Sequence, residues 1–222
     1  MTSKHQIYIL VGTALIVFIV YAVTNFNINI SPKNSQNTAP TQVKAAQDNQ
    51  SDDMSDHHKP KPSDSTVFNN LVGKTAPDFT LESFDGKKYT LGSLKGKNVL
   101  LFFNEGLMCY PACWNQVTAF GSDTEFSKKN TVVLNINVDP KDEWKKAYDK
   151  MPELARATVL IDTDRSVSQT YGVLTLPSSM HRGQFPGHSY VIVDKDGIIR
   201  FTQDDDQMAV RNKELLSEID KL

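Results

Sequence analysis

The sequence predicts an α/β fold in which helices flank both faces of a central mixed β-sheet. Short apolar runs alternate with segments of helical periodicity between residues 99 and 171. One of these runs, Val99–Phe103, is apolar at every position, as expected of a strand covered on both faces. A hairpin pattern and an amphipathic helix then end the chain, and this order adds antiparallel strands to a parallel sheet.

The first predicted strands form a hairpin. Residues 78–81 and 88–91 alternate in polarity on either side of Asp85-Gly86, a dipeptide that is a strong turn signal. The apolar strand that begins at Val99 follows. An amphipathic helix comes next and ends near residues 128–130, because apolar side chains recur at helical spacing: Cys113, Val117 and Phe120.

The second half of the domain repeats the alternation of strand and helix. Its predicted elements are a strand at 131–138, a helix that Asp139-Pro140 opens, a strand at 158–161, a short helix at 164–171 closed by Gly172, a hairpin of 189–193 and 198–201, and a final helix at 208–222. The apolar face of the final helix comprises Val210, Leu215, Leu216 and Ile219.

The amino-terminal part of the chain predicts a membrane anchor. Residues 7–23 (IYILVGTALIVFIVYAV) carry no charge and are long enough to cross a bilayer as a helix. Positive charge lies only on the amino-terminal side until Lys33, so the amino terminus is expected in the cytoplasm. Residues 1–26 would then hold the cytoplasmic terminus and the single transmembrane anchor of a cell-membrane protein whose domain is extracytoplasmic. A cleaved signal peptide is the alternative.

Residues 27–66 are predicted to be a disordered polar linker, because Ser, Asn, Gln, Asp, Lys and Pro dominate them and bury too little apolar surface. Within this segment, residues 52–58 (DDMSDHH) could bind a metal weakly, and a solvated linker is the alternative. Residues 67–222 have the length of one domain with its own core. The net charge of −2, with mixed signs, argues against nucleic-acid binding.

The only two cysteines of the chain follow the apolar strand, and open α/β sheets place their sites at such strand ends. We expect Cys109 at a helix start, where free backbone N–H groups and the helix dipole stabilise a thiolate. Pro111 fits the first turn of that helix. Cys113, one turn later, would be the partner thiol, at a Cα separation of roughly 6 Å. The alternative is a pair of inert thiols or a static staple.

Three motifs carry a resemblance to a known family: residues 73–81 (GKTAPDFTL), 171–173 (YGV) and 190–197 (YVIVDKDG). With the strand before the cysteines, they resemble the alkyl hydroperoxide reductase and thiol-specific antioxidant family, the peroxiredoxin-like redoxins of the thioredoxin fold. The resemblance implies a thioredoxin-like domain without a cofactor. One thiol would attack a peroxide or protein disulfide, a second would resolve the product, and a thiol reductant would reset the pair. Peroxiredoxins carry Thr or Ser and Pro where this chain has Gly106 and Phe102.

Two further residues are candidate members of the site. The position six residues before Asp194, where peroxiredoxins carry an arginine and thioredoxins a cis-proline, holds His188. His188 could face Cys109, where it would stabilise the thiolate when protonated or relay a proton. Alternatively, it caps a loop edge. Glu105 is a candidate proton acceptor for Cys113, with a solvated loop carboxylate as the alternative.

The sequence leaves two main functions open. The first is a membrane-anchored extracytoplasmic thiol-dependent oxidoreductase, with antioxidant or disulfide-reductase activity, that cycles Cys109 and Cys113 between dithiol and disulfide. The second is a copper chaperone, because Sco-like proteins share the fold, the anchor, the cysteine spacing and a histidine before the late hairpin. Cys109, Cys113 and His188 would then be copper ligands. Soft side chains nearby in sequence could add to them: Met108, Met180 and His181. A non-catalytic surface domain is a third alternative.

Overall fold

The structure, a computed structural model, describes residues 61–222. The predicted anchor at residues 7–23, and the predicted linker up to residue 60, lie outside these residues. Among residues 61–222, no helix combines the length and hydropathy that a membrane crossing requires. The first described residues already contact the domain, because the Asp64 N–H donates to the Thr175 carbonyl at 2.8 Å and the Thr175 hydroxyl donates back to the Asp64 carbonyl at 2.7 Å.

Within the described residues, seven strands form one mixed sheet in the order β2-β1-β5-β4-β3-β6-β7. The strands are β1 (Thr80–Ser83), β2 (Lys88–Thr90), β3 (Asn98–Phe103), β4 (Thr131–Asn137), β5 (Val159–Ile161), β6 (Ser189–Val193) and β7 (Ile199–Asp204). The three central strands β5, β4 and β3 run parallel, and the hairpins β1-β2 and β6-β7 add antiparallel edges. The predicted mixed sheet is therefore confirmed.

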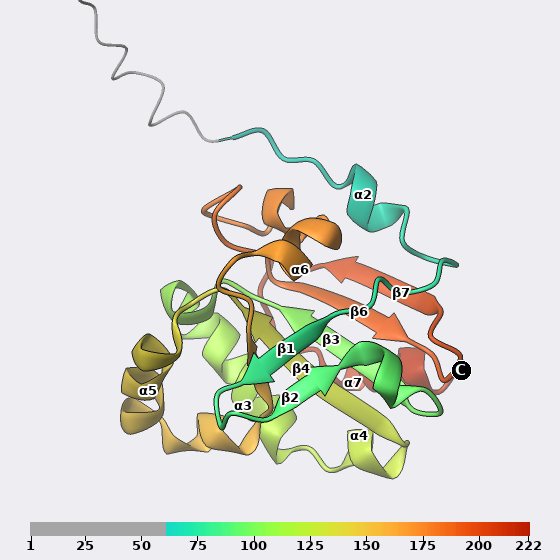
Figure 1. Cartoon of the computed structure of the whole chain (residues 1–222), viewed down its shortest axis with the longest axis horizontal. Coiled ribbons are helices and arrows are strands. Elements are labelled where there is room, and N and C mark those ends of the chain that lie inside the picture. The colour runs from blue at the N-terminus through green and yellow to red at the C-terminus, as the bar shows by residue number, and fades with distance from the viewer. Residues whose placement is uncertain (1–60) are drawn as a thin grey trace, which may run out of the picture. The chain divides into compact units, whose positions relative to one another are not determined.

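Helices connect the strands and cover the sheet (Figure 1). The α-helices are α2 (Thr66–Asn69), α3 (Ala112–Ser122), α4 (Glu125–Lys128), α5 (Lys141–Lys150), α6 (Ser166–Thr170) and α7 (Asn212–Ile219). Short 3-10 helices lie between them: η2 (Leu91–Leu94), η3 (Gly106–Cys109), η4 (Pro152–Arg156) and η5 (Val173–Thr175). Helix α5 shows why such segments are helical, because acidic residues occupy its first turn and Lys150 its last, which complements the helix dipole.

The sheet separates two hydrophobic clusters, and alternate residues of β3 contribute to each of them. Leu100 and Phe102 pack with side chains from α3, α5 and α7, whereas Leu101 and Phe103 pack with side chains from α2 and α6. Every residue of β3 is buried, which confirms that this strand is covered on both faces. The β3 strand lies in the middle of the sheet beside β4 (Figure 1). The segment that follows β3 therefore starts from a rigid part of the domain.

The predicted single helix between the cysteines and residues 128–130 is wrong. Two helices, α3 and α4, replace it, and the chain is extended at Asp123, with ψ of 109°. The Asp123 side chain accepts the Glu125 N–H at 3.0 Å and a hydrogen bond from Asn212 Nδ2 at 2.9 Å. An aspartate that binds nearby backbone N–H groups competes with helical hydrogen bonding, and it ends one helix and starts the next.

The final helix is shorter than the predicted 208–222, because α7 begins only at Asn212. The Asp205 carboxylate accepts two backbone N–H groups of the following turn, at 3.1 and 3.2 Å, and pairs with Arg211 Nε at 2.8 Å. These bonds hold the preceding segment as a loop. Val210, predicted on the apolar face of the helix, is exposed as a result.

Candidate active site

The two cysteines form a disulfide bond, with their Cα atoms 5.3 Å apart. Cys109 is the last residue of η3 and Cys113 the second residue of α3, so both follow the carboxyl end of β3. The pairing of the two sulfur atoms at this edge of the sheet agrees with the prediction. The predicted α-helix start at Cys109 is wrong, because α3 begins at Ala112 and Pro111 directly precedes it.

Hydrogen bonds around Gly106 determine the turn that carries Cys109. Gly106 has a φ of +60°, its N–H donates to Asn104 Oδ1 at 2.9 Å, and its carbonyl accepts from Trp114 Nε1 at 3.2 Å. The next N–H, of Leu107, donates to Asp139 Oδ2 at 2.8 Å. Burial raises the pKa of Asp139, although the Leu107 N–H opposes that shift. The turn is therefore tied both to α3 and to the chain that follows β4.

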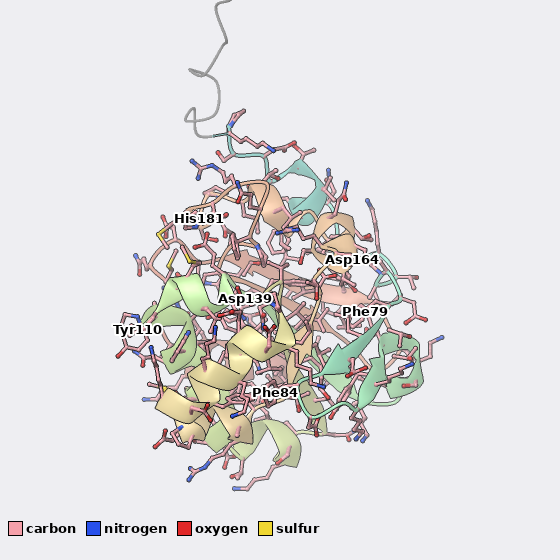
Figure 2. The ribbon with its side chains drawn as sticks, turned by 60° about the vertical axis from the view of Figure 1, so that its left-hand side comes forward. Phe79, Phe84, Tyr110, Asp139, Asp164 and His181 are labelled. Carbon is pink, nitrogen blue, oxygen red and sulfur yellow. A yellow bond between two sulfur atoms is a disulfide. The ribbon has the colours of Figure 1, made fainter. Side chains whose placement is uncertain are left out.

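Cys109 is the more accessible of the two sulfur-bearing residues, although only 3% of it is exposed. Cys113 is fully buried. The side chain of Met208 packs against Cys109, with its Sδ atom 3.8 Å from Cys109 Sγ. The two neighbours of Cys109, Met108 and Tyr110, are exposed, and Figure 2 shows Tyr110 projecting from the domain. The small exposed area of the disulfide therefore belongs to Cys109.

A groove of about 530 Å³ opens beside this turn. One wall consists of large apolar side chains from the cysteine turn and the start of α3: Leu107, Tyr110 and Trp114. The other carries charged side chains of α5: Glu143, Lys146 and Lys150. Ligand sites are concave and largely apolar with a few polar groups, and this groove has that composition. It opens next to the turn that carries Cys109, although neither cysteine is among its lining residues.

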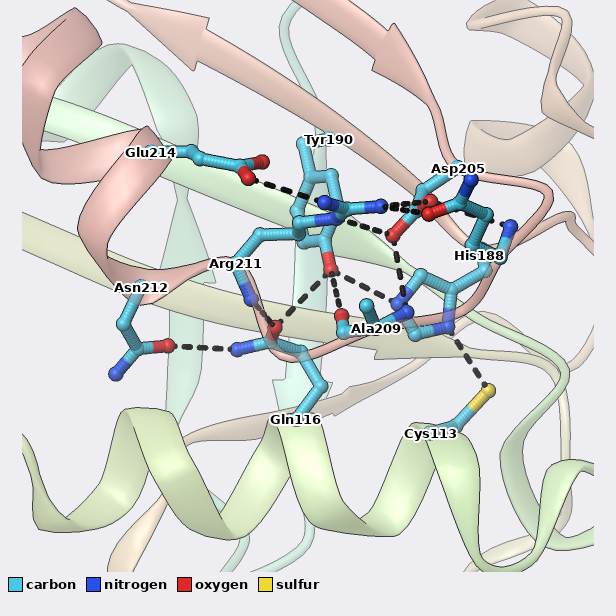
Figure 3. Close-up of polar contacts among 10 residues, drawn as sticks. Cys113, Gln116, His188, Tyr190, Asp205, Ala209, Arg211, Asn212 and Glu214 are labelled. Atoms are coloured by element: carbon cyan, nitrogen blue, oxygen red, sulfur yellow. Dashed lines mark hydrogen bonds and ion pairs between the residues drawn. The ribbon is translucent and has the colours of Figure 1, made fainter.

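His188 contacts Cys113 rather than Cys109, which corrects the predicted orientation. Its Nδ1 atom lies 3.5 Å from Cys113 Sγ, and its Nε2 atom lies 2.8 Å from the Tyr190 hydroxyl (Figure 3). The side chain is fully buried. Burial lowers the pKa of His188 to about 4, although Asp205 opposes the shift. The imidazole is therefore neutral at pH 7, which disfavours stabilisation of the thiolate by a protonated His188 and leaves the predicted proton relay open.

The burial of neutral His188 predicts a loss of stability in mild acid. Native His188 stays unprotonated down to about pH 4, whereas the unfolded chain binds a proton near the ordinary pKa of 6.5. Because the unfolded state binds more protons between these values, the free energy of unfolding falls as the pH is lowered through this window, by about 3 kcal/mol. Urea denaturation from pH 4 to pH 7 measures this slope. His188→Gln should flatten it, and parallel profiles for the two proteins would contradict the prediction.

Glu105 is buried, so the alternative of a solvated loop carboxylate is wrong. Its Oε1 atom accepts the N–H groups of Met180 and His181, at 2.5 and 3.1 Å, and the Ser179 hydroxyl at 3.2 Å. The His181 ring lies 3.4 Å from the other oxygen. These bonds are directed at the loop 179–181 and not at Cys113. Glu105 therefore anchors that loop, and its predicted role as a proton acceptor for Cys113 remains a prediction.

Among the described residues, potential metal-ligand atoms of Cys109, Cys113 and His188 lie close enough together to bind one metal ion. One potential ligand atom from each lies within 4.8 Å of the others. The two sulfur atoms are bonded to each other in this structure, so the pair would have to be reduced before either sulfur could bind a soft metal ion. The copper alternative therefore stays a prediction. Of its further ligands, Met108 and Met180 are exposed to solvent.

Sequence reasoning missed three residues that surround the site. Tyr190 contacts His188, Gln116 contacts Tyr190, and Met208 contacts Cys109. Two of these residues could have been predicted from their spacing in the sequence. Tyr190 lies two residues beyond His188, so the two side chains point to the same side of the sheet. Gln116 lies one helical turn after Cys113 on α3. No local pattern indicates Met208, because it comes from the loop that Asp205 holds in place.

A mixed α/β domain of this topology, with a disulfide where its central strand ends, defines a thioredoxin-like protein with a redox-capable cysteine pair. Comparison with known families agrees with this class. The model of the AhpC/TSA family matches residues 72–202, which is more than half of the chain. The chain belongs to the AhpC/TSA family, and the resemblance inferred from the sequence motifs is confirmed.

Individual relatives include both peroxiredoxins and thiol-disulfide oxidoreductases. The chain is 33% identical over 138 residues to chloroplastic peroxiredoxin Q of Oryza sativa subsp. japonica, a match that covers 58% of this chain and 57% of the relative. It is 31% identical over 127 residues to the thiol-disulfide oxidoreductase ResA of Bacillus thuringiensis subsp. konkukian, covering 57% and 65% of the two chains. The mitochondrial 2-Cys peroxiredoxin from Plasmodium falciparum superimposes with a TM-score of 0.57 at 26% identity, covering 68% of this chain and 93% of that one.

Proposed function

We propose that this protein is a thiol-disulfide oxidoreductase that uses the Cys109–Cys113 pair to reduce disulfides in protein substrates. The observation that carries the proposal is the bond between the two sulfur atoms at the end of the central strand, beside a neutral histidine. Similarity to peroxiredoxin Q and to ResA supports thiol chemistry in general. The groove beside the disulfide supports a polypeptide as the substrate.

The surroundings of Cys109 favour a disulfide over a peroxide as the oxidant. Cleavage of a peroxide is helped by hydrogen-bond donors that stabilise the developing charge on oxygen. Gly106 has no side chain to offer, and the Phe102 ring packs against His188 with the ring centres 4.7 Å apart. The Cys109 sulfur lies 3.8 Å from Met208 Sδ and within 4.8 Å of a ring nitrogen of His188, and the Met208 thioether donates no hydrogen bond. A disulfide substrate needs no such donor, because a thiolate is a stable leaving group.

In the proposed reaction, the reduced protein transfers two electrons to a substrate disulfide. The Cys109 thiolate attacks one substrate sulfur, the substrate S–S bond breaks, and the departing thiolate takes up a proton. Cys113 then gives up its proton and attacks the Cys109 sulfur, and the second substrate thiolate departs and is protonated. The substrate ends as two thiols and the protein as the Cys109–Cys113 disulfide. An external thiol reductant resets the pair.

Variants with a single cysteine test the proposal. The reduced Cys113→Ser protein should stop at a mixed disulfide between Cys109 and the substrate, visible as an added mass on the intact protein. Cys109→Ser should lose turnover of a model protein disulfide by at least about a hundredfold, because the attacking thiolate is gone. Hydrogen peroxide serves as the competing oxidant. A faster reaction of Cys109 with peroxide than with the disulfide would identify a peroxiredoxin, and no reaction with either would refute thiol catalysis.

We also propose that residues 7–23 anchor the protein in the cell membrane with its domain on the extracytoplasmic side. The uncharged run and the position of the first positive charges support this topology. Disulfides also persist in extracytoplasmic compartments, where the proposed substrates would be found. Alkaline extraction of membranes should leave the full-length protein in the pellet. Its release into the soluble fraction would refute the anchor.

A further inference from the structure

Polar residues behind His188 determine which of its two ring nitrogens carries the proton. The chain of hydrogen bonds begins at Asn212, whose Nδ2 group donates to the Ala119 carbonyl at 3.2 Å and to Asp123 Oδ2 at 2.9 Å. Both of these partners accept only, so the amide of Asn212 has one orientation. Its Oδ1 atom is then the acceptor for Gln116 Nε2–H, at 2.8 Å.

The same argument fixes the amide of Gln116. Its Oε1 atom accepts the Arg211 backbone N–H at 2.7 Å, and a backbone N–H can only donate. The Tyr190 hydroxyl lies 3.1 Å from that same Oε1 atom and 3.4 Å from the Ala209 carbonyl. Both partners are acceptors, so each can receive the single hydroxyl proton of Tyr190 and neither can supply one. The amide of Gln116 is therefore oriented from both of its ends.

With its proton directed at these acceptors, the Tyr190 oxygen is left to accept a hydrogen bond from His188. The Nε2 atom of His188 lies 2.8 Å from this oxygen, and the Nε2–H tautomer is the one that can donate to it. A neutral imidazole has one such proton, which leaves a lone pair on Nδ1. That atom is the one 3.5 Å from Cys113 Sγ (Figure 3).

We infer that Gln116 and Tyr190 are positioning residues that hold neutral His188 as the Nε2–H tautomer, so that Nδ1 accepts the proton of the Cys113 thiol. The inference rests on the proposed disulfide exchange. In the resolving step, the proton moves from Cys113 Sγ to His188 Nδ1, and the new thiolate attacks the Cys109 sulfur. The bond between Cys109 and the substrate breaks, and the proton passes from Nδ1 to the departing thiolate. The imidazolium forms beside the thiolate, which stabilises it although the site is buried.

Two variants perturb the hydrogen-bond chain, and a third is a matched control. Gln116→Met removes the nearer of the two acceptors for the Tyr190 hydroxyl and leaves only the Ala209 carbonyl at 3.4 Å, so the hydroxyl proton turns toward His188 Nε2 more readily. Tyr190→Phe removes the hydroxyl itself. The control is Tyr171→Phe, because the fully buried Tyr171 also loses one hydrogen bond, to the Pro77 carbonyl at 2.8 Å, on the other face of the sheet.

The first readout is the tautomer of His188 in the full-length reduced protein, measured by ¹⁵N–¹H correlation NMR with ¹⁵N-labelled histidine and assigned with His188→Gln. The second is the rate at which Cys113 releases a thionitrobenzoate leaving group attached to Cys109. We expect the Nε2–H form in the wild type and in Tyr171→Phe, and a population of the Nδ1–H form in the two test variants. Their release step should slow by about tenfold or more, because a positioned base contributes roughly a hundredfold or more to such a step.

The tautomer readout requires no turnover, so it separates this inference from the proposed function. An Nδ1–H tautomer in the wild type overturns the inference whether or not the protein exchanges disulfides. Equal release rates in Tyr190→Phe and Tyr171→Phe overturn it as well. The Nε2–H form in a protein that fails to reduce any disulfide supports the hydrogen-bond assignment and refutes the proposed function instead.

Discussion

Replacement of Gly106 by alanine is expected to lower the free energy of unfolding by about 3 to 5 kcal/mol and to displace the turn that carries Cys109. Gly106 has a φ of +60°, where a side chain costs about 1 to 2 kcal/mol. A Cβ atom there would also overlap Asp139 Oδ2. The carboxylate would have to leave the Leu107 N–H, and the loss of a hydrogen bond to a charged group costs about 1.5 to 3 kcal/mol.

Gly96→Ala is the matched control for this prediction. Gly96 has a comparable φ of +87°, but a Cβ atom there would have nothing within 4 Å. It should therefore show only the backbone cost, about 1 to 2 kcal/mol. Urea denaturation of the oxidised proteins measures both losses, and alkylation of Cys109 after reduction reports the displaced turn. Equal losses in the two variants would show that the approach of Asp139 to Gly106 does not matter.

Replacement of Glu105 by alanine is expected to cost about 3 to 5 kcal/mol. The buried carboxylate accepts two backbone N–H groups of the loop 179–181, and alanine would leave both without a partner. Each of these partly buried donors that loses its partner costs about 1 to 3 kcal/mol, and bonds to a carboxylate lie at the upper end. The loop should consequently become more mobile. Hydrogen exchange of the Met180 and His181 amides measures that change directly.

Two other glutamate variants serve as comparisons for Glu105→Ala. Glu82→Ala removes a half-exposed carboxylate that pairs with Lys141 at 3.1 Å, and it should change stability by less than about 1 kcal/mol. Glu105→Gln keeps an oxygen for the loop amides but cannot take up a proton as a carboxylate does. Because the bonds of Glu105 point to the loop, we expect this variant to resolve mixed disulfides at the wild-type rate. A slow Glu105→Gln protein would instead support the predicted proton transfer from Cys113.

Most strands could be predicted because their signals are local. The Asp-Gly turns at Gly86 and Gly197 both have a φ of +86°, as the hairpin predictions require. The apolar run of β3 needs burial on both faces and receives it. Helix boundaries were predicted less well, because single side chains decide them. The side chains of Asp123 and Asp205 each accept backbone N–H groups that a longer helix would have used. The spacing of apolar residues does not reveal such side-chain hydrogen bonds.

In the candidate site, too, local features could be predicted from the sequence and long-range contacts could not. The sequence by itself determined that two thiols, four residues apart, follow a buried strand, since both facts depend on neighbours in the chain. Only the tertiary structure decided that His188 faces Cys113, that Glu105 turns toward the loop 179–181 and that Met208 contacts Cys109. His188 and Cys113 lie 75 residues apart, so their contact depends on the register of β6 against β3 and on the face of the sheet that α3 covers. Those relations arise only when the layers pack, and no local pattern of residues encodes them.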